Sequence, residues 1–362
     1  MARILVLNVK VPFTAGGQDV LVQTLSQELK RREHLVDIIE LPFHPVPKEA
    51  LLEQAALWRA LKLDEFAGVK VDLVIATKFP SYYARHQCKS LWLVHQHRPI
   101  YDLYGTRFCD FSDDPRDEAL RRMLTEGDQQ VIGECAFVSG ISKNVVERLH
   151  RYNGISGAVL YPPLPQGNRY RCEKGEDYIL SVGRICSIKR VDLVLKALTH
   201  VARNIKLKIV GTPDEPGVME YLKNEIAKHH LWERVDFLGR VDNEVLLDLY
   251  AKALAVYYAP YNEDYGYVTL EALASGKPLI TAKDSGGVLE FVEHERHGLV
   301  VEPTVEALGA AINRLVQDRA WAERLGQAGR EFVEKSELME QGWDQIVDRL
   351  LSPLPRNGKH GA

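Results

Sequence analysis

The stretch of sequence that decides the fold runs from Leu254 to Pro278 and reads LAVYYAPYNEDYGYVTLEALASGKP. Its first part, 254–260, is apolar and aromatic and ends in proline, which predicts a buried strand. Residues 266–275 predict a short helix that ends at Gly276, and a second strand follows. A strand, a loop, a helix and another strand form the repeating unit of an α/β protein with a parallel sheet.

The same alternation extends outward over the whole chain. In the first half we expect strands at 4–8, 36–39, 72–76, 91–95 and 136–139 and helices at 18–31, 48–63, 115–131 and 142–151. In the second half we expect strands at 178–182, 206–210 and 235–238 and helices at 191–202, 217–229 and 243–252. Helical patterns without intervening strands follow at 307–316, 319–333 and 341–351.

A chain of 362 residues is too long for one comfortable core, so two domains are expected. The segment Val159–Pro165 contains three prolines, which remove backbone donors and stiffen a connection. We therefore predict two Rossmann-like domains that face a cleft, each with a parallel sheet. The predicted divisions are a first domain at 1–164, a second at 165–336, a terminal helix at 337–352 that returns to the first domain, and a disordered tail at 353–362.

The composition is that of an ordinary globular protein, with 46 Lys and Arg against 50 Asp and Glu and a net charge of −4. This balance does not indicate a nucleic-acid partner. The cysteines are odd in number, 5, and scattered, so we expect a reducing, cytoplasmic location. The sequence lacks an apolar run of about 18 residues, so any membrane association is expected to be peripheral, at the inner face.

One set of residues has the chemistry of a phosphate site. Gly183 and Arg184 directly follow the expected strand 178–182, and Lys189 comes just before the next helix. Glycine lets the backbone approach a ligand, Arg offers a planar fork of donors, and Lys adds a point charge. A diphosphate bound without a metal needs two such cations.

Two carboxylates are predicted near the same edge of the sheet. Glu263 lies in the loop after the strand 254–260, and Glu271 lies on the helix that follows. Ligands of open α/β sheets bind at the carboxyl ends of strands, where helix N-termini offer amides to anions. Carboxylates at this edge suit the hydroxyl groups of a polyol or sugar.

The first half offers weaker candidates. Gly16 and Gly17 stand between the first strand and the first helix, where their amides could face a phosphate, although a tight turn explains them equally well. His95 ends the expected strand 91–95 and His97 lies just beyond it, but no complementary ligands accompany them, so we expect no metal. Carboxylates at 110–114 are expected to cap a helix. The nucleophile motif Gly-x-Ser-x-Gly is absent.

Together these residues resemble the retaining GT-B glycosyltransferases of family four. The resemblance rests on four ordered motifs and spans nearly the whole chain: Gly16-Gly17, Gly183-Arg184 with Lys189, the pair Glu263 and Glu271, and Gly286-Gly287 with Glu290. Two motifs depart from the family pattern: Ile188-Lys189-Arg190 stands where the family often has Glu-Lys-Gly, and Asp264-Tyr265-Gly266 stands where it often has Gly-Phe-Gly.

The resemblance implies a role for each site residue. Arg184 and Lys189 would hold the donor diphosphate, Glu263 the donor sugar and Glu271 the ribose. A histidine, His97 in preference to His95, would lie near the donor sugar. The remaining implied donor-binding residues are Gly16, Gly17, Gly183, Gly211, Leu238, Gly266, Tyr267, Val268 and Thr269.

The implied reaction is the metal-independent, retaining transfer of a hexose from a nucleotide-diphosphate sugar to a saccharide, polyol or lipid-linked acceptor. No cofactor is expected beyond the donor substrate. The alternatives are a nucleotide-sugar epimerase and a non-catalytic nucleotide-sugar-binding subunit on the same fold. A pyridoxal-phosphate-dependent phosphorylase would need a much longer chain, and a dehydrogenase would need a dinucleotide fingerprint that this sequence lacks.

Overall fold

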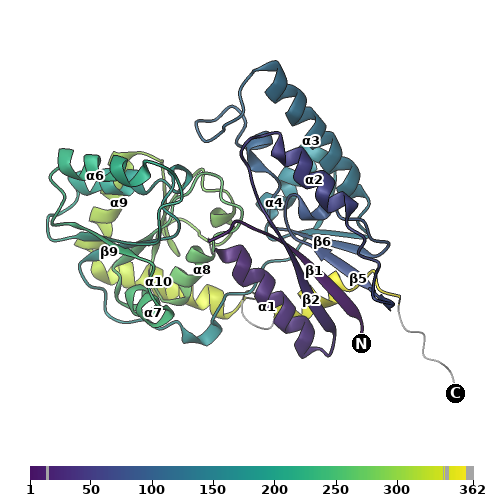
Figure 1. Ribbon diagram of the computed structural model, residues 1–362. Helices are drawn as coiled ribbons and strands as arrows, with labels where there is room; N and C mark the ends of the chain where they lie inside the picture. Colours follow the sequence, from purple (N-terminus) through teal and green to yellow (C-terminus); the bar gives the residue numbers. More distant parts are fainter. Residues whose placement is uncertain (14–15, 337, 339–341, 356–362) are drawn as a thin grey trace. The chain divides into compact units, whose positions relative to one another are not determined.

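A computed structural model describes residues 1–13, 16–336, 338 and 342–355 of this protein. The chain divides into two compact units (Figure 1). Unit 1 comprises Met1–Pro162 and Gln341–Ala362, and unit 2 comprises Pro163–Glu340. Most of the tail expected to be disordered, at 356–362, lies outside the described residues.

Unit 1 contains a parallel sheet with the strand order β2-β1-β5-β6-β7-β8. Its strands are β1 (Arg3–Lys10), β2 (Leu35–Pro42), β5 (Leu73–Ala76), β6 (Lys89–Leu93), β7 (Phe137–Gly140) and β8 (Ala158–Val159). Strands β1, β5 and β6 are almost continuously buried, as expected when helices cover both faces of a parallel sheet. A small antiparallel hairpin, β3 (Glu65–Phe66) and β4 (Val69–Lys70), lies apart from this sheet.

The helices of unit 1 are α1 (Gly17–Arg31), α2 (Ala50–Ala60), α3 (Pro115–Gly133), α4 (Lys143–Asn153) and α11 (Gly342–Leu350), with single turns η1 (Ser81–Tyr83) and η2 (Arg98–Ile100). Two of these helices, α3 and α4, begin at a side-chain cap. The Asp114 carboxylate caps α3 by accepting from the Arg116 amide at 2.8 Å. The Ser142 hydroxyl caps α4 in the same way, accepting from the Val145 amide at 3.0 Å.

The C-terminal helix α11 packs on unit 1. The ring of Trp343 meets that of Trp92 edge to face at 5.9 Å, and the Ser90 hydroxyl donates to the Leu350 carbonyl at 2.7 Å. Ile346, Val347 and Leu350 are buried. The helix therefore covers apolar surface of the first sheet although it is encoded after the second unit.

Unit 2 repeats the architecture with the strand order β11-β10-β9-β12-β13-β14. Its strands are β9 (Tyr178–Val182), β10 (Lys206–Val210), β11 (Val235–Gly239), β12 (Ala255–Tyr257), β13 (Leu279–Ala282) and β14 (Gly298–Val301). All of its strand pairings are parallel. The order reverses direction between β9 and β12, and at such a switch point the loops after neighbouring strands separate and leave room for a ligand.

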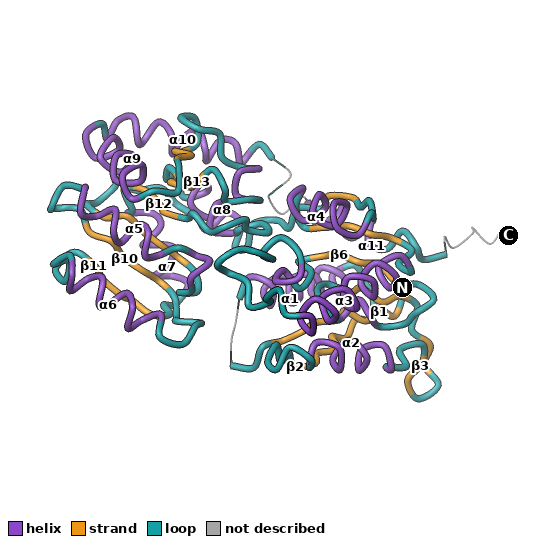
Figure 2. Tube along the Cα trace, turned by 90° about the horizontal axis from the view of Figure 1, so that it is seen from above, coloured by secondary structure: helices purple, strands orange, loops and turns teal. Residues whose placement is uncertain are grey.

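Helices cover both faces of the second sheet (Figure 2). They are α5 (Val191–Ala197), α6 (Val218–Lys228), α7 (Asn243–Lys252), α8 (Tyr267–Ala274), α9 (Val305–Gln317) and α10 (Arg319–Glu334). Single turns are η3 (Gly167–Arg169), η4 (Ser187–Lys189), η5 (Leu198–His200) and η6 (Gly287–Glu290). Successive residues of β9 alternate between the two cores, with Ile179 in one and Tyr178 and Leu180 in the other.

The prediction of two α/β units with parallel sheets is confirmed. The strand expected at 254–260 is shorter than predicted: β12 spans only Ala255–Tyr257. The short strands β8 and β14 were not predicted. Among the described residues, no helix combines the length and the apolar character that crossing a membrane requires.

Candidate functional site

The carboxyl ends of β9, β10 and β11 are held together through glycine backbone. The Gly183 amide donates to the Val210 carbonyl at 3.0 Å, and the Gly211 amide donates to the Gly239 carbonyl at 2.8 Å. Gly211 has φ 142, and a Cβ on it would lie 1.8 Å from the Gly183 carbonyl oxygen. Only glycine fits at this position. The predicted residues Gly183, Gly211 and Leu238 lie at the ends of β9, β10 and β11 or directly after them.

Arg184 lies just after the end of β9, and its side chain forms an ion pair with Asp214 in the segment that follows β10. The adjacent backbone reinforces the arrangement, because the Ile185 amide donates to the Thr212 carbonyl at 2.9 Å. The Arg184 side chain remains about half exposed, at 54%. A guanidinium has five N–H donors, so pairing with one carboxylate leaves it capacity for an anionic ligand.

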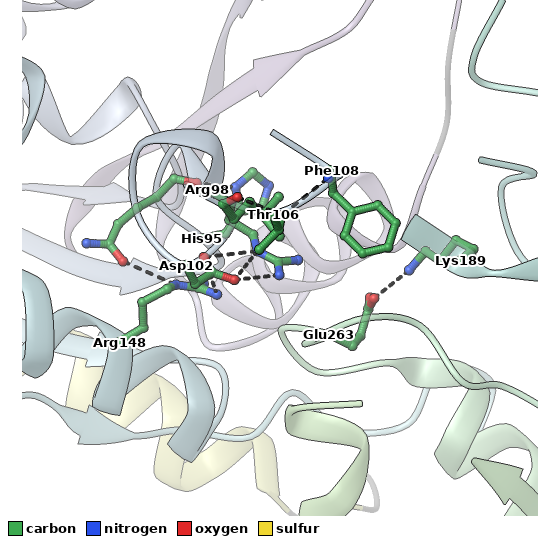
Figure 3. A network of polar contacts seen from close by, with 10 residues as sticks. His95, Arg98, Asp102, Thr106, Phe108, Arg148, Lys189 and Glu263 are labelled. Carbon is green, nitrogen blue, oxygen red and sulfur yellow. Dashed lines mark hydrogen bonds and ion pairs between the residues drawn. The ribbon is translucent and has the colours of Figure 1, made fainter. Parts of the chain in front are cut away.

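Lys189 lies at the end of η4 and is the centre of the site. Its ammonium donates to the Glu263 carboxylate at 2.6 Å (Figure 3). It also donates to the Tyr258 hydroxyl at 3.0 Å and lies 5.2 Å from the centre of the Tyr258 ring. The side chains of Lys189 and Glu263 are mostly buried, 14% and 16% exposed. We expected the cations and the two glutamates to act as separate groups, but Lys189 and Glu263 form one ion pair.

The loop that carries Glu263 is fixed by the loop after β13. The Glu263 amide donates to the Ser285 carbonyl at 3.1 Å, and the Gly287 amide donates to the Glu263 carbonyl at 2.7 Å. A Cβ on Gly287 would lie 2.5 Å from the Asp264 carbonyl oxygen. The Gly286-Gly287 pair of the sequence therefore lets two backbones pack closely and hold Glu263 in place.

Glu271 lies on α8, with its side chain in a ring of tyrosines. The Tyr250 hydroxyl donates to its carboxylate at 2.6 Å, and the Tyr170 hydroxyl also bonds to it. Burial raises the pKa of Glu271 above its ordinary value of 4.5, and the hydrogen bonds from Tyr250 and Tyr170 oppose that rise. This carboxylate is thus oriented by aromatic hydroxyls before any ligand arrives.

The first turn of α8 collects the remaining residues predicted in unit 2. Gly266 precedes the helix, and Tyr267, Val268 and Thr269 form its first turn. Amides at a helix start lack partners within the helix and attract anions. The Thr269 hydroxyl is fully buried and has no hydrogen-bond partner among the described residues. The predicted residues at 266–269 therefore form one potential anion-binding turn.

In unit 1 the two candidate histidines have different surroundings. His97 lies among three aromatic rings, with centroid distances of 6.3 Å to Phe43, 5.5 Å to Phe79 and 6.1 Å to Phe111. Burial lowers the pKa of His97 to about 3, so its imidazole is neutral at physiological pH. The His95 ring instead contacts the Gln96 carbonyl through Nδ1 at 2.8 Å.

A buried ion-pair cluster supports the segment that follows these histidines (Figure 3). Arg98 donates to the Asp102 carboxylate at 2.6 and 3.0 Å, and Arg148 lies 3.4 Å from the same carboxylate. Arg148 comes from α4, so the cluster ties η2 to that helix. Arg98, Asp102 and Arg148 show no shared pattern in the sequence that predicts this cluster.

The predicted phosphate loop at Gly16 and Gly17 forms the start of α1. The Gly16 amide donates to the Asp19 carboxylate at 2.9 Å, so an acidic side chain already occupies this amide. Residues 14 and 15 of the same loop lie outside the described residues. Within the described part of the chain, no group of three or more His, Cys, Asp or Glu side chains is arranged to hold a metal ion.

Several residues of the site were missed by sequence reasoning. Tyr258 and Tyr250 hold Lys189 and Glu271, and Arg190 joins the loops around them. Of these three residues, only Arg190 could have been singled out from the sequence, because it directly follows Lys189 in the motif. The tyrosines lie in a strand end and a helix, where an apolar pattern predicts burial but gives no partner.

Comparison with known proteins agrees with this geometry. The family model for glycosyl transferases group 1 matches residues 168–332. An uncharacterised glycosyltransferase of Methanocaldococcus jannaschii is 30% identical to this chain, covering 94% of each.

Solved structures share the fold. Sucrose-phosphate synthase from Thermosynechococcus elongatus has a TM-score of 0.80 at 20% identity, covering 98% of this chain and 99% of that one. The HepE protein of Anabaena in complex with UDP-glucose has a TM-score of 0.72 at 17% identity, covering 98% and 100%. The resemblance found in the sequence is confirmed: this chain has the GT-B fold and belongs to the group 1 glycosyltransferases.

Proposed function

We propose that this protein transfers a hexose, with retention of anomeric configuration and without a metal ion, from a nucleoside-diphosphate sugar to a saccharide, polyol or lipid-linked acceptor. The observation that carries the proposal is the clamp on Lys189, whose ammonium contacts Glu263 at 2.6 Å and Tyr258 at 3.0 Å beside Gly183 and Arg184. This clamp lies at the switch point of the second sheet, where an anionic ligand is expected.

The two cations supply the electrostatic part of the reaction. As the bond between the sugar and the diphosphate breaks, its electron pair leaves with the nucleoside diphosphate. Arg184 and Lys189 stabilise that charge, and an acceptor hydroxyl forms the new glycosidic bond while its proton passes to the departing phosphate. Fixed donors aimed at developing charge typically contribute a factor of about 10²–10³ in rate each.

The two glutamates position the donor. Glu263 aligns Lys189 and offers its remaining acceptor capacity to sugar hydroxyls, while Glu271 accepts from the ribose. Of the two histidines, we choose His95 for a ligand contact, because three aromatic rings surround His97 and keep it neutral. This choice reverses our preference from the sequence.

The raised pKa of Glu271 predicts a pH dependence. Only the ionised carboxylate accepts two ribose hydroxyls, so nucleotide affinity should fall as the pH is lowered through this raised pKa. Tyr250→Phe removes a hydrogen bond that lowers the pKa of Glu271, so it should move the fall to higher pH. Calorimetric titration of nucleotide at several pH values measures the shift.

Tyr178→Phe is the matched control for this prediction. Tyr178 is also a buried tyrosine of unit 2, but its hydroxyl donates to the Leu249 carbonyl at 2.7 Å and is not bonded to Glu271. Its profile should match that of the wild type. A Tyr250→Phe profile that also overlays the wild type would show that Glu271 is not the group that titrates.

The donor is identified by a panel of UDP-, GDP- and ADP-sugars in thermal shift experiments. We expect UDP-glucose to stabilise the protein, since the similar Anabaena HepE structure holds that compound. A ligand present at 100 times its dissociation constant adds about 2.7 kcal/mol to the free energy of unfolding. If none of the nucleotide sugars raises the melting temperature, the proposal is wrong.

Three controls on the stabilising donor test the finer claims. The anomeric configuration of the product, read by NMR, tests retention, and full activity in EDTA tests metal independence. Incubation of the donor without acceptor separates transfer from epimerisation, because only an epimerase changes the sugar under those conditions.

We also propose a cytoplasmic location. All five cysteines are free thiols: Cys88, Cys109, Cys135, Cys172 and Cys186. Free thiols in this number are typical of a reducing compartment. Peripheral membrane contact stays an alternative that cell fractionation tests.

A further inference from the structure

The residue after Lys189 has an unusual backbone. Arg190 has φ 53 and ψ 38, the left-handed conformation that favours glycine, and only 4% of the residue is exposed. A buried, charged side chain at such a position persists only where surrounding contacts compensate for it. Those contacts all lie within unit 2.

The Arg190 guanidinium makes four hydrogen bonds to two loops. Its Nε donates to the Ala259 carbonyl at 2.6 Å and its Nη2 donates to the Pro260 carbonyl at 2.9 Å. Both terminal nitrogens also donate to the Asp284 carboxylate, at 2.8 and 2.7 Å. The Arg190 carbonyl in turn accepts from the Tyr257 hydroxyl at 2.8 Å.

These contacts join the three segments that build the Lys189 clamp. Arg190 itself is adjacent to Lys189, Ala259 and Pro260 lie between Tyr258 and Glu263, and Asp284 begins the loop that contains Gly287. The Asn262 amide also donates to the Asp284 carbonyl at 2.8 Å, and the Tyr261 amide donates to the Ile188 carbonyl at 2.9 Å. The guanidinium thus bonds both flanking loops.

We propose that Arg190 is a positioning residue for glycosyl transfer, which fixes Lys189 relative to Glu263 and Tyr258. It touches neither substrate nor reacting atoms in this assignment and acts through Lys189. The inference rests on the proposed function of the clamp. A role in stability alone is the competing explanation, since the same bonds also hold unit 2 together.

Arg190→Gly separates the two explanations. Glycine adopts the left-handed backbone without strain, so this variant removes the guanidinium while it keeps the turn. We expect kcat to fall by about 10²-fold, with less than about a threefold change in the KM of the donor, because misplacement of a catalytic group by about 1 Å can cost that much. Added guanidinium chloride, at concentrations well below those that denature, should restore part of kcat.

Arg234→Ala is the matched control. Arg234 directly precedes β11 and therefore lies at the amino end of that strand, whereas Lys189 lies near the carboxyl ends. The Arg234 guanidinium donates to the carbonyls of Leu198, Val201, Ala202 and Ile205. Its loss removes a comparable set of hydrogen bonds. We expect a fall in Tm similar to that of Arg190→Gly, a kcat within about twofold of wild type, and no response to guanidinium.

Asp284→Asn provides a second route if Arg190→Gly does not fold. The substitution keeps the shape of the side chain, which is 35% exposed, and removes only the charge that pairs with Arg190. An intermediate loss of kcat, about tenfold, supports the proposal. Wild-type kcat in this variant and in Arg190→Gly, or a loss matched by Arg234→Ala, overturns it.

Hydrogen exchange makes the outcome independent of activity. If the wild type transfers no sugar from any donor, the proposed function fails, but the positioning claim is still tested by the amides of Glu263 and Gly287. These amides should exchange faster in Arg190→Gly or Asp284→Asn than in wild type and be unchanged in Arg234→Ala. Equal exchange in all four proteins rejects the positioning role.

Discussion

Lys189→Ala is expected to lower kcat/KM for the donor by about 10³-fold, or about 4 kcal/mol of transition-state stabilisation. The variant removes the ammonium that lies between the Glu263 carboxylate, at 2.6 Å, and the Tyr258 hydroxyl, at 3.0 Å. It also leaves the largely buried Glu263 carboxylate without this cation, and the unpaired negative charge repels the donor diphosphate. Steady-state kinetics with the donor identified by thermal shift measures the loss.

Lys196→Ala is the control for this prediction, because Lys196 reproduces the same chemistry away from the strand ends. On α5 its ammonium donates to the Tyr221 hydroxyl at 2.7 Å, lies 3.4 Å from the Asp192 carboxylate, and is 5.3 Å from the Tyr221 ring centre. Its removal should leave kcat/KM within about twofold of wild type. Equal losses in both variants would mean that Lys189 acts through stability and not through the leaving group.

Glu263→Ala is expected to lower kcat by about 10²-fold while nucleotide affinity changes little. Loss of Glu263 releases Lys189 from its ion pair, so the cation still binds diphosphate but is no longer held where the charge develops. Glu271→Ala should do the opposite and weaken nucleotide affinity by about tenfold, because Glu271 is oriented by Tyr250 at 2.6 Å to accept hydroxyl groups. Calorimetry for affinity and steady-state kinetics for kcat separate the two.

The double variant of Lys189 and Glu263 completes this comparison. Residues in direct contact lose less together than the sum of their separate losses, and a coupling of about 1 kcal/mol or more is expected here. A Glu263→Ala variant that loses affinity and turnover in the same proportion as Glu271→Ala would contradict the separate roles.

Local pattern predicted most of the elements of the fold. The helix at 266–275 is α8 (Tyr267–Ala274), and the helix at 18–31 is α1 (Gly17–Arg31), because a glycine or a cap limits each of them. The strand β8 was missed because two residues, Ala158–Val159, carry no detectable period. The strand predicted at 254–260 is longer than β12, because an apolar run in the sequence does not show where pairing with the neighbouring strand ends.

The two histidines show where sequence reasoning reaches its limit. His95 and His97 occupy alternate positions of one segment, so local pattern treats them as equivalent. The rings that surround His97 come from Phe43, Phe79 and Phe111, which belong to separate loops of unit 1. Only the strand order β2-β1-β5-β6 brings those loops together at one edge.

The sequence by itself determined the two parallel-sheet units and the helices that cover them, because periodicity, glycines and prolines act over a few residues. For the same reason it placed Gly183, Lys189, Glu263 and Glu271 near the carboxyl ends of the strands. Tertiary structure alone decided the partners. Lys189 meets Glu263 across 74 positions of sequence, and Arg190 meets Asp284 across 94. Such contacts depend on β9 pairing with β12 and β12 with β13, and that strand order follows from the packing of the whole unit and not from any local stretch.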